Sequence, residues 1–309
     1  MRPFVLPFAI LLGFLFHRTL VSLNYLTPYL IFLILFLTLC DMDIRQIRIS
    51  RLHIWLLLFQ LITGIGCYFL FLPFNDILAQ GAMMGMLAPV AVSATVVAVI
   101  LGADMATMVT YTILYNVFLA FFAPFCFSLI GYHTGLSFWA SCWIIIRKVV
   151  PLIILPLVSA VLCRRFLPRI TAKIVNHKMI SFYLWAAALT FVIGQTIDFI
   201  MMQDRSKTPI IIVMVAISLV QCIVQFAFGR WIGKKYDDTI AGGQAIGQKN
   251  GVLAAWMTQM YLNPLASVVP ASYVLWQNLW NSWQLWRFKS PGPANKRVPM
   301  PNEEEKHSN

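Results

Sequence analysis

Residues 242–263, GGQAIGQKNGVLAAWMTQMYLN, decide the fold of this chain. The stretch lies between two long apolar segments, yet its first nine residues include three glycines, two glutamines, a lysine and an asparagine. Such a composition does not suit a helix that faces lipid, because backbone polar groups at membrane depth need hydrogen-bond partners. We therefore expect a helix that is interrupted near Lys249 and is shielded by protein or by a wet cavity.

The first half of the chain has a counterpart to this stretch. Residues 79–101 contain Gly81, Gly85 and Pro89, followed by Ser93 and Thr95, inside another apolar run. A pair of interrupted apolar segments at corresponding positions of two halves is the best sequence indication of a binding site in a membrane transporter.

The composition indicates a polytopic membrane protein. The chain has 309 residues, of which 60% are hydrophobic and only 11% are charged, and this is too apolar for a soluble domain of this size. Ten apolar segments predict an all-α fold of ten transmembrane helices: 3–16, 25–40, 52–73, 77–101, 105–131, 148–163, 179–202, 208–232, 241–264 and 266–286. The interrupted segments are the fourth of each set of five. Since an odd number of spans inverts the second set, this order predicts two inverted five-helix repeats in which helices 4 and 9 are discontinuous and cross.

The basic residues predict the orientation. The net charge is +12, but the lysines and arginines lie in short connectors, which favours a topological role over a nucleic-acid partner. With the N-terminus inside, 17 of the 23 basic residues fall on the cytoplasmic side, 5 fall outside, and Lys249 is the remaining one. We expect an integral membrane protein with both termini in the cytoplasm.

The domain boundaries follow from the same pattern. The first repeat covers residues 1–131 and the second repeat residues 148–287. Residues 132–147, rich in Trp and Phe, are predicted to form an amphipathic helix at the outer interface, and the alternative is a long sixth helix. The proline-rich tail 288–309 is expected to be disordered and cytoplasmic. Asp198 is expected near the outer edge beside Asp204 and Arg205, with a place in a transport pathway as the alternative.

Two motifs resemble those of a known family. Gly247-Gln248-Lys249-Asn250, with Asn278 in the last span, is similar to the Glu-x-Gly-x-Gln-Asn crossover motif of the bile acid:sodium symporter family. Residues 89–95, followed by Gly102-Ala103-Asp104, resemble the same family's Pro-Gly-Gly-Thr-x-Ser-Asn crossover. The resemblance extends over all ten spans in number and order, and it is specific in these two segments.

This resemblance implies a core domain of spans 3–5 and 8–10 and a panel domain of spans 1, 2, 6 and 7. An organic anion, a bile acid or another amphipathic carboxylate, would bind between them and be carried by alternating access. A bacterial inner membrane is the implied location. The residues expected to bind the substrate are Thr95, Thr112, Asn250 and Asn278.

The family's two sodium sites are altered in this chain. The positions of the first site read Ala94, Thr95, Met108, Thr112 and Ala245. The positions of the second site read Gln60, Ala245 and Lys249. Gln60, Thr112 and Asn250 keep the family's character, but the carboxylate that both sites share is replaced by Ala245. We therefore predict that both sodium sites are lost, and no other metal or cofactor is expected.

Lys249 replaces a neutral amide with an ammonium group. A sodium ion about 4 Å from it would cost on the order of 4 kcal/mol at an effective dielectric of about 20, so we predict no sodium coupling. In one hypothesis Lys249, with Gln60 and Gln248 beside it, is a permanent substitute for the ion. In another it titrates and a proton is the coupling ion, since burial favours neutral lysine. In the third, Lys249 reaches the cytoplasmic interface and has no role in coupling.

The sequence leaves three functions open. The first is a secondary transporter of organic anions that is proton-coupled or a uniporter. The second is a membrane sensor or binding protein on the same fold that does not transport. A membrane enzyme is not indicated, because the sequence has no nucleophile elbow or metal-ligand cluster and its five histidines are scattered. The substrate, the transport direction and the oligomeric state are not indicated.

Overall fold

The computed structural model describes residues 5–40, 42, 47–131, 137–176 and 178–289. This part of the chain contains no strand, and its only β-pairing is an isolated bridge between Val90 and Lys249. Four of its helical segments are long and apolar enough to cross a membrane, and two further apolar helices, Thr27–Leu39 and Ala186–Met201, are shorter. The fold is therefore all-helical, as in a helical membrane protein.

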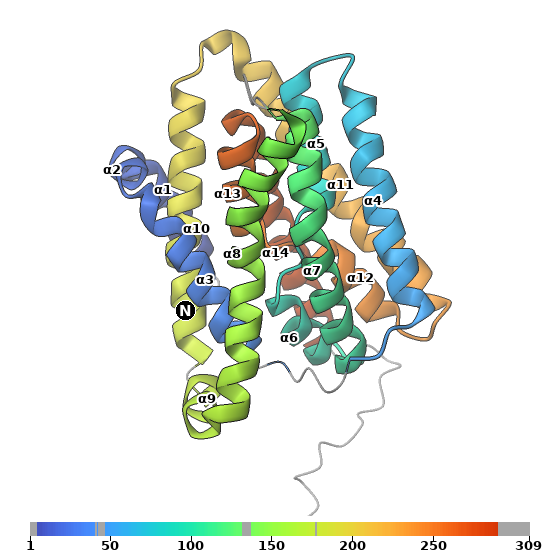
Figure 1. The fold of residues 1–309 in the computed structure, drawn as a ribbon. Coiled ribbons are helices and arrows are strands. Elements are labelled where there is room, and N and C mark those ends of the chain that lie inside the picture. Colours follow the sequence, from blue (N-terminus) through green and yellow to red (C-terminus); the bar gives the residue numbers. More distant parts are fainter. Residues whose placement is uncertain (1–4, 41, 43–46, 132–136, 177, 290–309) are drawn as a thin grey trace, which may run out of the picture.

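For description we divide the helices into two groups, which lie side by side in Figure 1. We call the first group the panel helices: α1 (Val5–Leu15), α2 (His17–Ser22), α3 (Thr27–Leu39), α8 (Phe138–Phe166), α9 (Pro168–Asn176) and α10 (Lys178–Met201). We call the second group the core helices: α4 (Arg51–Phe71), α5 (Asp76–Leu87), α6 (Ser93–Ile100), α7 (Met105–Ile130), α11 (Thr208–Lys234), α12 (Thr239–Gly247), α13 (Gly251–Tyr261) and α14 (Val268–Lys289). Three short 3₁₀ helices connect consecutive helices: η2 (Asn24–Leu26) joins α2 to α3, η4 (Arg205–Lys207) joins α10 to α11, and η5 (Pro264–Ser267) joins α13 to α14.

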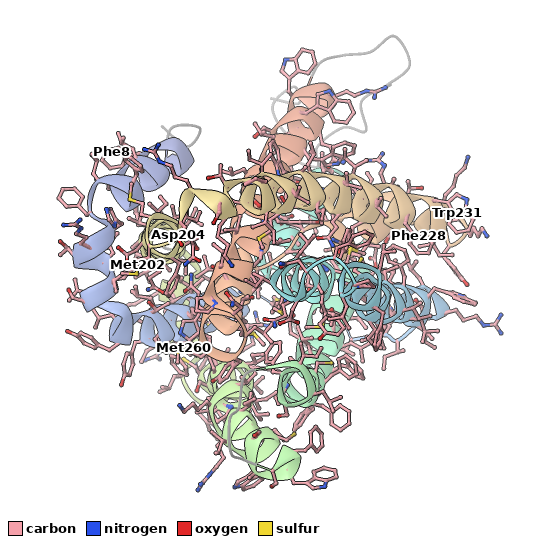
Figure 2. The ribbon with its side chains drawn as sticks, turned by 90° about the horizontal axis from the view of Figure 1, so that it is seen from above. Phe8, Met202, Asp204, Phe228, Trp231 and Met260 are labelled. Atoms are coloured by element: carbon pink, nitrogen blue, oxygen red, sulfur yellow. The ribbon has the colours of Figure 1, made fainter. Side chains whose placement is uncertain are left out.

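Figure 2 shows the structure from above. Phe8, Met202 and Asp204 mark the side of α1 and α10, while Phe228 and Trp231 of α11 lie on the opposite side. The groups are joined along α7 and α8 and also where α10 meets α13, η5 and α14.

Both interrupted segments are broken, as predicted. α5 stops at Leu87 and α6 begins at Ser93, and α12 stops at Gly247 and α13 begins at Gly251. In the view of Figure 1 the α5–α6 pair runs downwards and the α12–α13 pair runs upwards, so the two broken helices are antiparallel.

Local chemistry explains where these helices start and stop. Pro89 has no N–H and disfavours helical backbone at Ala88, whose ψ is 141°, so α5 cannot continue. Asn75 caps α5 by accepting from the Leu78 N–H, and Asp238 caps α12 by accepting from the Ala241 N–H.

Glycines bring α11 and α12 into close contact. A Cβ atom added to Gly229 would lie 2.2 Å from the Gly242 carbonyl oxygen, and one added to Gly233 would lie 2.5 Å from the Asp238 carbonyl oxygen. Small residues spaced by four on α11 therefore let the backbone of α12 approach its surface, as in helix pairs of membrane proteins.

Two expectations about boundaries change. Residues 138–166 form one continuous helix, α8, so a separate amphipathic helix over 132–147 is wrong and the long sixth helix is the better description. α8 continues through Pro151 and Pro156, although each proline lacks the N–H for one helical hydrogen bond. Residues 132–136 lie outside the described part of the chain, as does the tail from residue 290, whereas residues 288 and 289 end α14.

Candidate functional site

The candidate site is the place where the two broken helices cross. Residues 88–92 and 248–250 are not helical, and Val90 and Lys249 face each other in an antiparallel bridge. The Ala91 N–H donates to the Gln248 carbonyl at 3.1 Å, and the Asn250 N–H donates to the Pro89 carbonyl at 2.7 Å. Each interruption therefore supplies partners for backbone groups that the other leaves without helical bonds.

Two side-chain amides hold the remaining backbone groups of the bridge. Asn116 of α7 accepts from the Val90 N–H at 2.8 Å and donates to the Val90 carbonyl at 3.0 Å. Gln277 of α14 accepts from the Lys249 N–H at 2.7 Å and donates to the Lys249 carbonyl at 2.9 Å. The same arrangement thus occurs once at each interruption, and each amide comes from the long helix that follows its own broken pair.

The C-terminal end of α5 is surrounded by donors. The Gly85 carbonyl accepts from Gln225 Nε2 at 3.2 Å, and the Leu87 carbonyl accepts from the Tyr115 hydroxyl at 3.0 Å. The Met86 carbonyl accepts from Lys249 Nζ at 3.0 Å and from Gln60 Nε2 at 3.3 Å. The last carbonyls of a helix lack intrahelical partners and carry its negative dipole end, so an ammonium group at this position is stabilising.

Lys249 is buried beside an aromatic ring, and neither interruption supplies a carboxylate. Its side chain is 2% exposed, and Nζ lies 5.6 Å from the centre of the Tyr115 ring, within range of a cation–π interaction. Residues 86–95 and 245–253 contain no Asp or Glu. The hypothesis that Lys249 extends to the cytoplasmic interface is therefore wrong, because the side chain is enclosed by the core helices.

The other residues predicted around the ion site lie in or beside this crossing. Gln60 is fully buried, donates to Met86 and accepts from the Tyr111 hydroxyl. Gln248 joins the crossing through its carbonyl, and its side-chain Oε1 is buried without a partner among the described residues. The positions predicted to have lost sodium ligands, Ala94, Met108 and Ala245, are all completely buried.

The predicted substrate residues divide into three kinds. The hydroxyls of Thr95 and Thr112 are buried and have no hydrogen-bond partner in the described part of the protein. Asn250 instead caps α13, because its Oδ1 accepts from the Leu253 N–H at 3.1 Å. Asn278 donates to the Val274 carbonyl of its own helix, and it is its neighbour Gln277 that holds the crossing.

Sequence reasoning missed Asn116 and Gln277 as site residues. Each is an amide side chain in an apolar span. Asn116 lies 26 residues after Val90, and Gln277 lies 28 residues after Lys249. A search for amides at similar distances after both interruptions would have found them. Tyr115 and Tyr273, which donate to the ends of α5 and α12, lie in the same two spans.

Asp198 lies in the last turn of α10, close in sequence to Asp204 and Arg205 as predicted, and its side chain is buried. It is 6% exposed and its Oδ1 lies 2.8 Å from Nδ1 of His17 at the start of α2. This pair joins α10 to α2, away from the crossing, so Asp198 has a structural partner within the panel helices.

The fold and the crossing define a helical membrane protein in which two interrupted helices meet in the interior. No family model and no curated protein matches the chain.

Proposed function

We propose that this chain is a sodium-independent secondary transporter of organic anions, built from ten spans in two inverted repeats and working by alternating access. The observation that carries the proposal is the crossing of α5–α6 with α12–α13, with Lys249 Nζ on the Met86 carbonyl. Irregular backbone at membrane depth is tolerated only where protein buries it or where it lines a water-filled cavity, and in transporters such interrupted helices form the substrate and ion sites. The repeated amide arrangement of Asn116 and Gln277, on oppositely directed halves, supports the inverted repeat.

An anionic substrate fits the electrostatics of the crossing. α6 and α13 both begin there, and helix N-termini carry a positive dipole end and free N–H groups. The unpartnered hydroxyls of Thr95 and Thr112 are further donors, and Lys249 adds a positive charge. Amphipathic carboxylates are the substrate class that this combination of donors and apolar surroundings would accept.

Sodium independence follows from the position of Lys249. Its ammonium group takes a main-chain carbonyl that a bound cation would otherwise use, and no carboxylate in either interruption offsets the charge. We assign Lys249 the role of a permanent substitute for the coupling ion. The Met86 carbonyl at a helix C-terminus and the Tyr115 ring are the two contacts that would stabilise an ammonium group here against the cost of burial. Proton coupling through Lys249 is the competing mechanism.

The test is the thermal stability of the detergent-purified protein with and without bile acids, in sodium or potassium salt and at several pH values. A ligand that binds only the folded state raises the melting temperature, and we expect a rise that is equal in both salts. A rise seen only in sodium would overturn the proposal. A sodium-independent rise with no uptake of the bile acid into proteoliposomes would assign the chain to the non-transporting sensors.

The pH series separates the two roles of Lys249. A permanent cation predicts a ligand-dependent rise that is constant between mildly acidic and mildly basic pH. A pH dependence that disappears in Lys249→Gln would show that Lys249 titrates and would make proton coupling the leading mechanism. Lys148→Gln is the matched control, because Lys148 is exposed on α8 and its loss should leave the ligand response unchanged.

A further inference from the structure

Three polar side chains connect α10 to α13 and η5, and α10 and α13 both run towards the upper end of the bundle in Figure 1. Gln259 Nε2 of α13 donates to Thr196 Oγ1 at 3.1 Å and to Ser267 Oγ of η5 at 3.3 Å. The hydroxyls of Thr196 and Ser267 lie 3.3 Å apart. Since Thr196 already donates to the Val192 carbonyl of its own helix, Ser267 must be the donor between them.

Apolar packing closes the same end. Leu78, Leu265, Val268 and Val269 form a buried cluster with Met214 of α11, and Ile200 of α10 packs against it. Met260, next to Gln259, lies on the side of α3 in the view from above (Figure 2). The panel and core helices therefore meet here through neutral hydrogen bonds and side-chain packing.

α10 is held more firmly by the panel helices than by the core. His17 and Asp198 form a charge-assisted contact at 2.8 Å, and Gln195 Nε2 donates to Thr27 Oγ1 at 3.2 Å. Hydrogen bonds that involve charged groups are stronger than those between neutral groups. If the two groups of helices move apart, α10 should therefore stay with α2 and α3 and separate from α13 and η5.

The hydrogen bonding of the three residues is incomplete. Thr196 is 5% exposed and Ser267 is fully buried, but Gln259 is half-buried and its Oε1 has no partner among the described residues. A partly satisfied buried network gains less from staying closed, because an unpaired acceptor regains a partner when water enters. This contact is thus suited to repeated opening.

We propose that Thr196, Gln259 and Ser267 form a latch that closes the upper side of the substrate pathway and opens when the panel and core helices separate. The proposal rests on the alternating-access function proposed above. It assigns the moving boundary to the contact between α10 and the α13–η5 segment, and it assigns this structure to the state in which the upper side is closed.

The test is a reversible cross-link. Thr196→Cys with Ser267→Cys joins panel to core, and Ser218→Cys with Ser272→Cys is the matched control. The control hydroxyls lie 2.8 Å apart, but both belong to core helices, α11 and α14. With the latch pair oxidised, we expect uptake of radiolabelled cholate into proteoliposomes to be lost and to return on reduction. The oxidised control should transport as well as the reduced control.

Hydrogen exchange gives a readout that needs no substrate. Oxidation of the latch pair should slow exchange of the amides in residues 193–201 and 255–262, because opening exposes them, and oxidation of the control pair should not. Unchanged exchange and uptake in the oxidised latch variant would overturn the proposal. Failure of the latch pair to cross-link where the control pair does would also contradict the observed contact. If no variant transports cholate, the transport function fails, while the exchange data still decide whether the latch opens.

Discussion

Lys249 takes part in the crossing through both its backbone and its side chain. Its N–H and carbonyl are held by Gln277, and its Nζ reaches across to the Met86 carbonyl at the end of α5. One residue thus fixes the α12–α13 interruption against α14 and also against the other broken helix. The bridge to Val90 adds a third link. The geometry of the crossing therefore depends strongly on Lys249.

Replacing Gln277 with Leu should destabilise the protein. The change leaves the N–H and carbonyl of Lys249 buried without partners, at a cost of roughly 1–3 kcal/mol for each group. The melting temperature of the purified protein should fall by several degrees. Asn278→Leu is the control on the next residue, because Asn278 only donates within its own helix, and it should change the melting temperature little. Equal effects of the two substitutions would show that the amide of Gln277 does not hold the crossing.

The α11–α12 pair illustrates how one element positions another. Gly229 and Gly233 remove side-chain volume from one face of α11, and Gly242 of α12 lies directly against that face. Asp238 caps α12 from the connector between the two helices. Because α12 is only nine residues long, its direction is set largely by this close packing. The packing on α11 therefore places the C-terminal end of α12 at the crossing.

Gly229→Ala should disturb this packing. The added Cβ would overlap backbone atoms of Gly242, and overpacking of a tight contact typically costs about 1–3 kcal/mol. We expect a lower melting temperature and faster hydrogen exchange in α12. The matched control is Gly66→Ala in α4, where an added Cβ meets no atom within 4 Å. Alanine is a better helix former than glycine by roughly 0.5–1 kcal/mol, so the control should melt at the same temperature or higher.

At the scale of the whole molecule, the two ends of the bundle differ in charge. α4 begins at Arg51, α8 ends with Arg164 and Arg165 in its last turn, and α11 ends at Lys234, and these termini lie at the lower end in Figure 1. The upper connection between α10 and α11 carries only two basic residues, at 205 and 207. Positive residues are retained on the cytoplasmic side, so we predict that the lower end faces the cytoplasm.

Cysteine labelling tests this orientation. Ser206 and Lys235 are both exposed, at the upper and lower ends of α11 respectively. A membrane-impermeant maleimide added to intact cells should label Ser206→Cys, whereas Lys235→Cys should react only after the membrane is permeabilised. The unsubstituted chain controls for its own cysteines, of which Cys67 and Cys163 are partly exposed. The reverse labelling pattern would show that the orientation is wrong.

Several features of the fold could be predicted from the sequence because their cause is local. α5 ends at Leu87 because Pro89 disfavours helical backbone at the residue before it. α12 ends at Gly247, where the polar run 247–250 begins. Nine of the ten predicted apolar segments agree with the helices to within several residues, whereas the sixth begins ten residues after the start of α8, and the short helices α2 and α9 were not predicted. The boundary near residue 138 was misread, because Trp and Phe at the start of α8 suit an interfacial helix as well as a long span.

The partners of the crossing could not be predicted, because they depend on contacts between distant segments. The sequence by itself determined that the chain is helical and apolar and that two helices are interrupted. It also determined that the segment around Lys249 contains no Asp or Glu. Only the tertiary structure decided that Asn116 and Gln277 hold the crossing and that Nζ of Lys249 contacts Met86, 163 residues away. The physical reason is that hydrophobicity and helix breaking act over a few neighbouring residues, whereas a buried polar group is satisfied by whichever donor or acceptor the packing brings within about 3 Å.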